Sequence, residues 1–273
     1  MTRIAALQMI STTDVNTNLQ EAARLIAQAA DQGAELVSLP ENFALMGQHD
    51  TDKVKIRESF GQGHIQDFLA TQATKYGVWL IGGTIPLVAD APDKVRAACL
   101  VLNNSGQCVA RYDKMHLFDV MVSPEESYCE SRTIEAGHNT NVVDTPFGRI
   151  GLAICYDVRF PELFRCLTAQ GATIISLPSA FTAMTGKAHW EILVRARAIE
   201  NLSYVLAPNQ GGVHANGRET YGDSLIVDPW GNILSRLGQG AGIIYADLDP
   251  TYLQTIRRNF PTLDHKRIAC QQP

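Results

Sequence analysis

Cys155 occupies a position from which a nucleophile could be presented. It follows an apolar run, residues 150–154, that is typical of a buried strand, and Pro161 soon afterwards favours the first turn of a helix. A strand-to-helix turn exposes a side chain and leaves nearby backbone N–H groups free to bind an oxyanion. Cys155 is therefore a candidate nucleophile. The alternative is a buried structural cysteine, which is common for free cysteines.

Glu41 and Lys114 also follow predicted strands. Glu41 comes directly after Leu39 and Pro40, at the end of a strand predicted over residues 35–39. Ligand sites in open α/β sheets gather outside strand ends, so a carboxylate there could act as a general base. The alternative is a helix-capping or solvated glutamate. Lys114 could equally be an ordinary surface lysine.

The six cysteines do not indicate a disulfide framework. The N-terminal residues show no signal-peptide pattern, so we expect a cytosolic protein. Disulfides are rare in the cytosol. Without a Cys-x-x-Cys pair or histidines at ligand spacing, the sequence predicts no metal site. We expect Cys99, Cys108 and Cys166 to be structural. Cys129, in a long loop, and Cys270, in the tail, could be exposed.

The elements that must position these residues alternate between strands and helices. Asp14 or Asn16 can cap a helix that ends at Gly33, and three more helices are predicted over residues 64–76, 161–170 and 187–201. The predicted strands cover residues 4–9, 35–39, 78–85, 97–102, 107–112, 150–154, 173–177, 203–207, 224–228, 233–237 and 242–248.

This order forms a β-α-β-α-β-hairpin pattern that occurs twice, over about residues 1–114 and 141–248. Two such halves could pack their sheets face to face. No Gly/Ser-rich or Pro-rich linker separates them, so we predict one α/β domain over residues 1–273, with a C-terminal extension. The irregular segment 115–141 is either a loop that folds over a site or a surface insertion.

Composition excludes several functions. The chain has 273 residues, of which 45% are hydrophobic and 19% charged, and its net charge is −5. No basic cluster is suited to tracking phosphates, so nucleic acid is not an expected partner. No apolar run reaches the roughly 18 residues that a membrane helix needs, so we expect a cytoplasmic protein without a membrane partner.

Three motifs together resemble the nitrilase superfamily of carbon–nitrogen hydrolases. They are residues 40–41 (PE), 114–119 (KMHLFD) and 155–162 (CYDVRFPE). The resemblance covers nearly the whole chain and is closest to the deaminated glutathione amidase branch. The strings that indicate this branch are residues 129–131 (CES), 185–191 (TGKAHWE), 195–201 (RARAIEN), 221–224 (YGDS) and 227–231 (VDPWG).

The resemblance implies a four-layer αββα sandwich and a homodimer formed through helices, for which residues 187–201 are a candidate. It also implies a cysteine-dependent amidase that forms a thioester and releases an amine or ammonia. In that reaction Cys155 attacks, Glu41 transfers protons, and Lys114 with the Tyr156 backbone N–H binds the oxyanion. Glu130 would be a second carboxylate that holds Lys114. No metal or organic cofactor is implied.

The resemblance further implies a small amide substrate that carries a carboxylate. Arg159 and Thr185 would bind that carboxylate, since arginine suits bidentate binding, and Phe43 and Phe181 would form the pocket wall. Arg159 could instead pair with Asp157 or Glu162.

The preferred substrate is deaminated glutathione, hydrolysed at its amide in metabolite repair. The first alternative is an ω-amidase acting on 2-oxoglutaramate. Less favoured are an N-carbamoyl amino acid hydrolase, a nitrilase and a non-catalytic binding protein.

Overall fold

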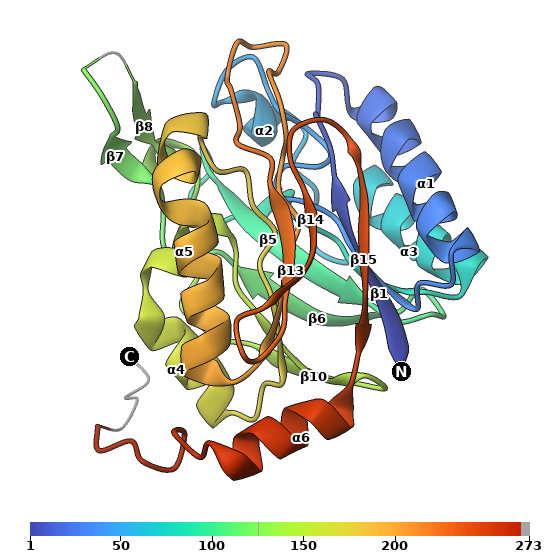
Figure 1. Ribbon diagram of the computed structural model, residues 1–273. Helices are drawn as coiled ribbons and strands as arrows, with labels where there is room; N and C mark the ends of the chain where they lie inside the picture. Colours follow the sequence, from blue (N-terminus) through green and yellow to red (C-terminus); the bar gives the residue numbers. More distant parts are fainter. Residues whose placement is uncertain (125, 269–273) are drawn as a thin grey trace.

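Two β-sheets face each other at the centre of the molecule, and helices cover both outer faces (Figure 1). This computed structural model describes residues 1–124 and 126–268; Cys270 lies outside them. The arrangement confirms the αββα sandwich that the sequence resemblance implies.

The first sheet contains most strands of the N-terminal half. Its order is β15 (Gly242–Leu248), β1 (Thr2–Gln8), β2 (Leu36–Ser38), β3 (Trp79–Ile81), β5 (Val95–Leu102) and β4 (Ile85–Val88), and β6 (Cys108–Asp113) also pairs with β5. Strands β1, β2 and β3 are parallel. Helices α1 (Val15–Asp31) and α3 (His64–Tyr76) cover its outer face, and the short α2 (Asp52–Lys55) lies between them in sequence.

The second sheet is built from the C-terminal half. Its order is β14 (Ile233–Leu237), β13 (Ser224–Val227), β12 (Tyr204–Ala207), β11 (Ile174–Ser176), β10 (Gly148–Leu152) and β9 (Val142–Thr145). Helices α4 (Pro161–Ala169) and α5 (Ala183–Asn201) cover it, and α6 (Pro250–Asn259) follows the last strand.

Alternate side chains of β1 pack into two different hydrophobic cores. Ile4 and Ala6 are buried among side chains of the second sheet, whereas Ala5 and Leu7 are buried among those of α1 and α3. Successive side chains of a strand point to opposite faces, so a continuous apolar run predicts a strand covered on both sides. Burial of the larger side chains, Ile4 and Leu7, stabilises the fold by about 1.5–3 kcal/mol each.

Two features of the first sheet differ from the predicted elements. The last strand, β15, lies in the second repeat of the sequence but pairs antiparallel with β1, from Thr2↔Leu248 to Gln8↔Gly242. The strand predicted over residues 78–85 is two strands, β3 and β4. The chain bends between them at Gly83, which has φ +56° and leaves no room for a Cβ beside the Pro40 carbonyl.

The segment 115–141 is partly ordered into secondary structure that the sequence did not indicate. A hairpin of β7 (Asp119–Met121) and β8 (Ser127–Cys129) precedes a 3₁₀ turn, Glu130–Arg132. In Figure 1 this hairpin projects beside the start of α5.

The five described cysteines form no disulfide with one another. Cys99 and Cys166 are buried, as expected, and Cys129 is half-buried. The expectation for Cys108 is wrong: it is exposed, because β6 is an edge strand and its first residues face solvent. Within residues 1–124 and 126–268, no helix is both long and apolar enough to cross a membrane.

Candidate active site

Cys155 begins the 3₁₀ turn Cys155–Arg159 that connects β10 to α4. Its φ is +46°, a left-handed conformation that a non-glycine residue rarely adopts. Its backbone N–H donates to the Pro178 carbonyl at 2.9 Å, which helps to hold this conformation. Backbone strain of this kind persists only where the surrounding structure enforces it, and it concentrates at functional sites. The side chain is 8% exposed and lines a pocket.

A buried carboxylate connects the Cys155 turn to the segment that follows Lys114. Asp157 is fully buried, and its Oδ2 accepts from the Ile154 N–H at 2.8 Å and the Tyr112 hydroxyl at 2.7 Å. Its Oδ1 lies 2.7 Å from His116 Nδ1 and 3.2 Å from the His116 backbone nitrogen, which donates to it. We call these four contacts the Asp157 clamp. The clamp sets the position of Lys114 relative to Cys155.

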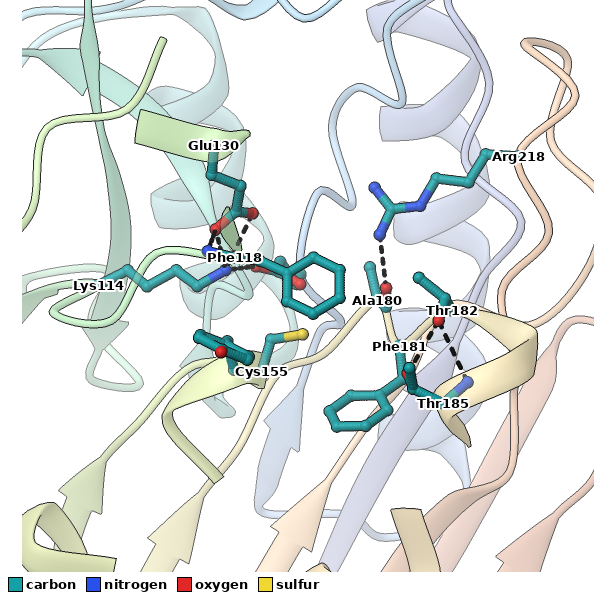
Figure 2. Close-up of a pocket in the computed structure, with 11 residues that line it drawn as sticks. Lys114, Phe118, Glu130, Cys155, Ala180, Phe181, Thr182, Thr185 and Arg218 are labelled. Carbon is teal, nitrogen blue, oxygen red and sulfur yellow. Dashed lines mark hydrogen bonds and ion pairs between the residues drawn. The ribbon is translucent and has the colours of Figure 1, made fainter. Parts of the chain in front are cut away.

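Lys114 is buried between two carboxylates (Figure 2). Its Nζ donates to Glu41 Oε1 at 2.9 Å and to the two Glu130 oxygens at 2.8 and 3.0 Å. Glu130 Oε2 also accepts from the Phe118 N–H at 2.8 Å, which fixes the carboxylate from a second side. Glu41 follows β2 and Glu130 opens the 3₁₀ turn after β8, so the ends of distant elements meet at one point.

The electrostatics of this group keep Lys114 charged and Cys155 protonated. Burial opposes the ammonium, but the charges of Glu130 and Glu41 outweigh it and raise the pKa of Lys114 well above its usual value. Burial also opposes ionisation of Glu130, yet Lys114 lowers the pKa of that carboxyl. The pKa of Cys155 is raised, first by burial and then by the Glu41 charge, although Lys114 partly offsets both. The resting thiol is therefore neutral, and an attack by sulfur requires a base.

Most of the predicted site residues share a single pocket. The predicted residues that line it are Glu41, Lys114, Glu130, Cys155, Tyr156, Phe181 and Thr185. Tyr156 is the second residue of the 3₁₀ turn Cys155–Arg159, and the first N–H groups of a helical turn have no partner within it. Thr185 Oγ1 lies 2.8 Å from Thr182 Oγ1 in the first turn of α5.

The prediction for Phe43 is wrong. Its side chain is fully buried in the core between the first sheet and helices α1 and α3. The chain is left-handed at Asn42, with φ 57°, and this turn directs Phe43 away from the pocket. Phe118 lines the pocket and, with Phe181, provides its aromatic wall.

Arg159 lies beside the aromatic side chains of the pocket. Its guanidinium carbon is 5.8 Å from the Tyr156 ring centroid and 5.4 Å from that of Phe181. Its Nη1 is 3.2 Å from His189 Nδ1. Among the described residues it forms no ion pair with Asp157 or Glu162, so the alternative reading of this arginine is not supported.

Sequence reasoning did not identify Phe118 or Arg218 as pocket residues. Phe118 belongs to a recognised motif, which was a usable signal. Arg218 lies in irregular chain between β12 and β13 and carries no local pattern. In the part of the chain that the structure describes, no group of three or more His, Cys, Asp or Glu side chains could hold a metal ion.

Comparison with known proteins agrees with this geometry. A family model described as carbon–nitrogen hydrolase matches residues 3–258. A protein of Synechocystis sp. named deaminated glutathione amidase is 45% identical over 265 residues, covering 96% of this chain and 97% of its own. The Homo sapiens protein of that name is 40% identical over 268 residues, covering 97% and 82%. The crystal structure of Saccharomyces cerevisiae Nit3, described as a member of branch 10 of the nitrilase superfamily, superposes with a TM-score of 0.87. It is 32% identical and covers 98% of this chain and 97% of its own.

Proposed function

The chain belongs to the carbon–nitrogen hydrolase family, and on that basis we propose that it hydrolyses deaminated glutathione with Cys155 as its nucleophile. Its membership makes it a hydrolase of carbon–nitrogen bonds other than peptide bonds. The observation that carries the proposal is the buried Lys114 ammonium, held by Glu41 and Glu130 in the pocket that contains Cys155. The names of relatives that are 40–45% identical support the substrate.

The first half-reaction forms a thioester. The Cys155 sulfur attacks the amide carbon while its proton passes to Glu41, since the pKa of the thiol is too high for a resting thiolate. The oxygen of the tetrahedral intermediate gains negative charge beside the Lys114 ammonium and the Tyr156 backbone N–H. The carbon–nitrogen bond then breaks, and Glu41 returns the proton to the leaving nitrogen.

The second half-reaction consumes one water molecule. Glu41 takes a proton from this water as its oxygen attacks the thioester carbon, and the same two donors stabilise the second oxyanion. The carbon–sulfur bond breaks and the sulfur recovers the proton from Glu41. For deaminated glutathione, which is glutathione with a keto group in place of its amino group, the products are 2-oxoglutarate and cysteinylglycine.

Glu130 acts on this reaction through Lys114. It holds the ammonium with both oxygens, at 2.8 and 3.0 Å, and is itself held by the Phe118 N–H. Lys114 therefore keeps its position when Glu41 becomes protonated and loses its negative charge. This division of roles explains why one lysine is paired with two carboxylates.

Arg159 and Thr185 bind the keto-acid carboxylate of the acyl half in this proposal. Arg159 is not itself a lining residue of the pocket, but its guanidinium lies 5.4 Å from the ring centroid of Phe181, which is one. A guanidinium at that distance, which is a bidentate partner for a carboxylate, supports this role. The Thr185 hydroxyl and backbone lie in the first turn of α5, where the helix dipole favours an anion. Phe118 and Phe181 contact the methylene groups.

The test measures both products from deaminated glutathione with purified protein, with Cys155→Ala as the matched control. We expect stoichiometric 2-oxoglutarate and cysteinylglycine, and a loss of about 10⁴-fold or more in the control. The alternative, an ω-amidase, would show a higher kcat/KM on 2-oxoglutaramate than on deaminated glutathione. The proposed substrate would be refuted if the protein formed no product from deaminated glutathione but hydrolysed 2-oxoglutaramate rapidly.

We extend the proposal to the state of the protein in the cell. The absence of a disulfide between described cysteines suits a reducing, cytoplasmic compartment. The shared core and the pairing of β15 with β1 support one domain. A homodimer through α5 is supported by exposed Ile192 and Ile199 on that helix, which are 70% and 45% accessible. Analytical ultracentrifugation tests this homodimer: wild type should sediment as a dimer and Ile192→Glu as a monomer.

A further inference from the structure

Arg218 places a positive charge at the active-site pocket, and no carboxylate among the described residues forms an ion pair with it. It lies on the segment between β12 and β13 and extends toward the side of the pocket opposite Lys114 (Figure 2). Its Nη2 donates to the Ala180 carbonyl at 2.8 Å, and its guanidinium carbon lies 5.1 Å from the Tyr128 ring centroid. Its Nε is buried and has no hydrogen-bond partner among residues 1–124 and 126–268. A buried N–H without an acceptor is unfavourable until a ligand or water supplies one.

The other lysine or arginine side chain that lines the pocket is already neutralised. Lys114 contacts two carboxylates, whereas no described carboxylate forms an ion pair with Arg218. Glu126, on the hairpin that carries Tyr128, is bound instead by the Tyr128 hydroxyl at 2.7 Å. Arg218 is therefore the lining cation that remains available for an anionic group of the substrate.

The segment that carries Arg218 packs against the segment that carries Glu41. Gln210 Nε2 donates to the Glu41 carbonyl at 3.0 Å, and Asn216 Nδ2 donates to the Gly47 carbonyl at 2.7 Å. Arg159 belongs to another element, the 3₁₀ turn Cys155–Arg159, and lies beside the Tyr156 and Phe181 rings. The two arginines thus approach the pocket from different elements and can bind different ends of one substrate.

Deaminated glutathione carries one carboxylate on each side of the scissile amide. In the proposed function Arg159 and Thr185 bind the carboxylate of the acyl half, which leaves the carboxylate of the amine half without a cation. Arg218 lines the pocket across from Lys114 (Figure 2), and no described carboxylate forms an ion pair with it. We therefore propose that Arg218 binds a carboxylate carried by the amine half, and so selects peptide-like amines over ammonia. This inference rests on the proposed function. In deaminated glutathione that carboxylate is the one on glycine.

The test compares two substrates that differ only at this carboxylate. The first is deaminated glutathione, and the second is its analogue with a glycine carboxamide. We expect wild type to prefer the carboxylate in kcat/KM by roughly 10–100-fold, the range of a charge-assisted hydrogen bond. We expect Arg218→Gln to bring that ratio close to one. Arg218→Lys, which keeps the charge, retains part of the preference.

Arg159→Gln is the matched control, because it removes the other arginine. It lowers kcat/KM on both substrates and leaves their ratio unchanged. An Arg218→Gln ratio equal to that of wild type, or a wild type with no preference, would overturn the inference. Failure of the proposed function would give a different result, because wild type would hydrolyse 2-oxoglutaramate but neither peptide-like substrate. That result would also overturn the role of Arg218 in binding the amine half.

Discussion

Replacing Asp157 with asparagine tests how the site is held together. The carboxylate is fully buried, and each of its oxygens receives two contacts. Asparagine keeps one acceptor oxygen but puts an NH₂ group in place of the other. If that group faces Ile154, two N–H groups oppose each other, although the Tyr112 hydroxyl can turn and accept. If it faces His116, the backbone N–H of His116 is opposed instead. At least one backbone donor therefore loses its acceptor in either orientation.

The expected magnitude follows from those contacts. A hydrogen bond to a charged group contributes about 1.5–3 kcal/mol, and the remaining contacts weaken when the charge is removed. We therefore expect a loss of about 3 kcal/mol in the free energy of unfolding, which for a protein of this size lowers Tm by about 6–12 °C. Because the clamp positions Lys114 relative to Cys155, kcat should fall about 100-fold.

The assay pairs differential scanning calorimetry with kcat on deaminated glutathione. Asp144→Asn is the matched control, since Asp144 is 83% exposed and pairs with Arg149 at the surface. Its Tm should stay within about 2 °C of wild type, because an exposed ion pair contributes about 0.5 kcal/mol, which corresponds to about 1–2 °C. If Asp157→Asn melts within the same 2 °C and keeps its kcat, the clamp does not hold the site and the reasoning is refuted.

Three further predictions follow from the same geometry. In steady-state assays Glu130→Gln should lower kcat about 10²–10³-fold and change KM less, because the substitution loosens the Lys114 ammonium but removes no contact with the substrate. An unchanged kcat would contradict this role of Glu130. The pKa of Glu130 is lower in the folded protein than in the unfolded chain, where it is about 4.3. Ionised Glu130 therefore stabilises the fold fully above that unfolded pKa, and the stabilisation is lost as pH falls through the folded pKa. The Tm difference between wild type and Glu130→Gln should accordingly be complete at pH 6–7 and shrink below about pH 4; a constant difference argues against the ion pair. Cys155→Gly should melt about 2–4 °C above Cys155→Ala, since glycine relieves the strain of a φ of +46°, and equal melting temperatures would show that the turn is not strained.

The strand-end residues could be predicted because their signals are local. Glu41 and Cys155 each follow a short apolar run, and such runs specify buried strands whose ends share one edge of a sheet. The structure brings both to one pocket. The proximity of Lys114 and Glu130 was implied by family resemblance, since no local pattern connects a strand end to a turn after a hairpin.

Phe43 and Arg218 show where local reasoning ends. Phe43 is two residues from Glu41, yet the left-handed conformation at Asn42 sends it to the opposite side of the first sheet. Arg218 lies on a segment that binds the Gly47 carbonyl through Asn216, far away in the sequence. Contacts between irregular segments depend on the complete fold, so composition and periodicity do not encode them.

The pairing of β15 with β1 has a similar origin. Residues 242–248 have an ordinary strand pattern that does not specify a partner. They pair antiparallel with Thr2–Gln8 of the first sheet, although they follow the hairpin of the second repeat. The repeat in the sequence therefore indicates two sheets but does not indicate the sheet to which this strand belongs.

Trapping of the acyl-enzyme tests the central claim most directly. Wild-type protein mixed with deaminated glutathione and acid-quenched within the first turnover should carry a 2-oxoglutaryl group, which peptide mass spectrometry should locate on Cys155. The same protocol with Cys155→Ala should give no adduct and no product. Formation of 2-oxoglutarate and cysteinylglycine by Cys155→Ala at the wild-type rate would contradict the account.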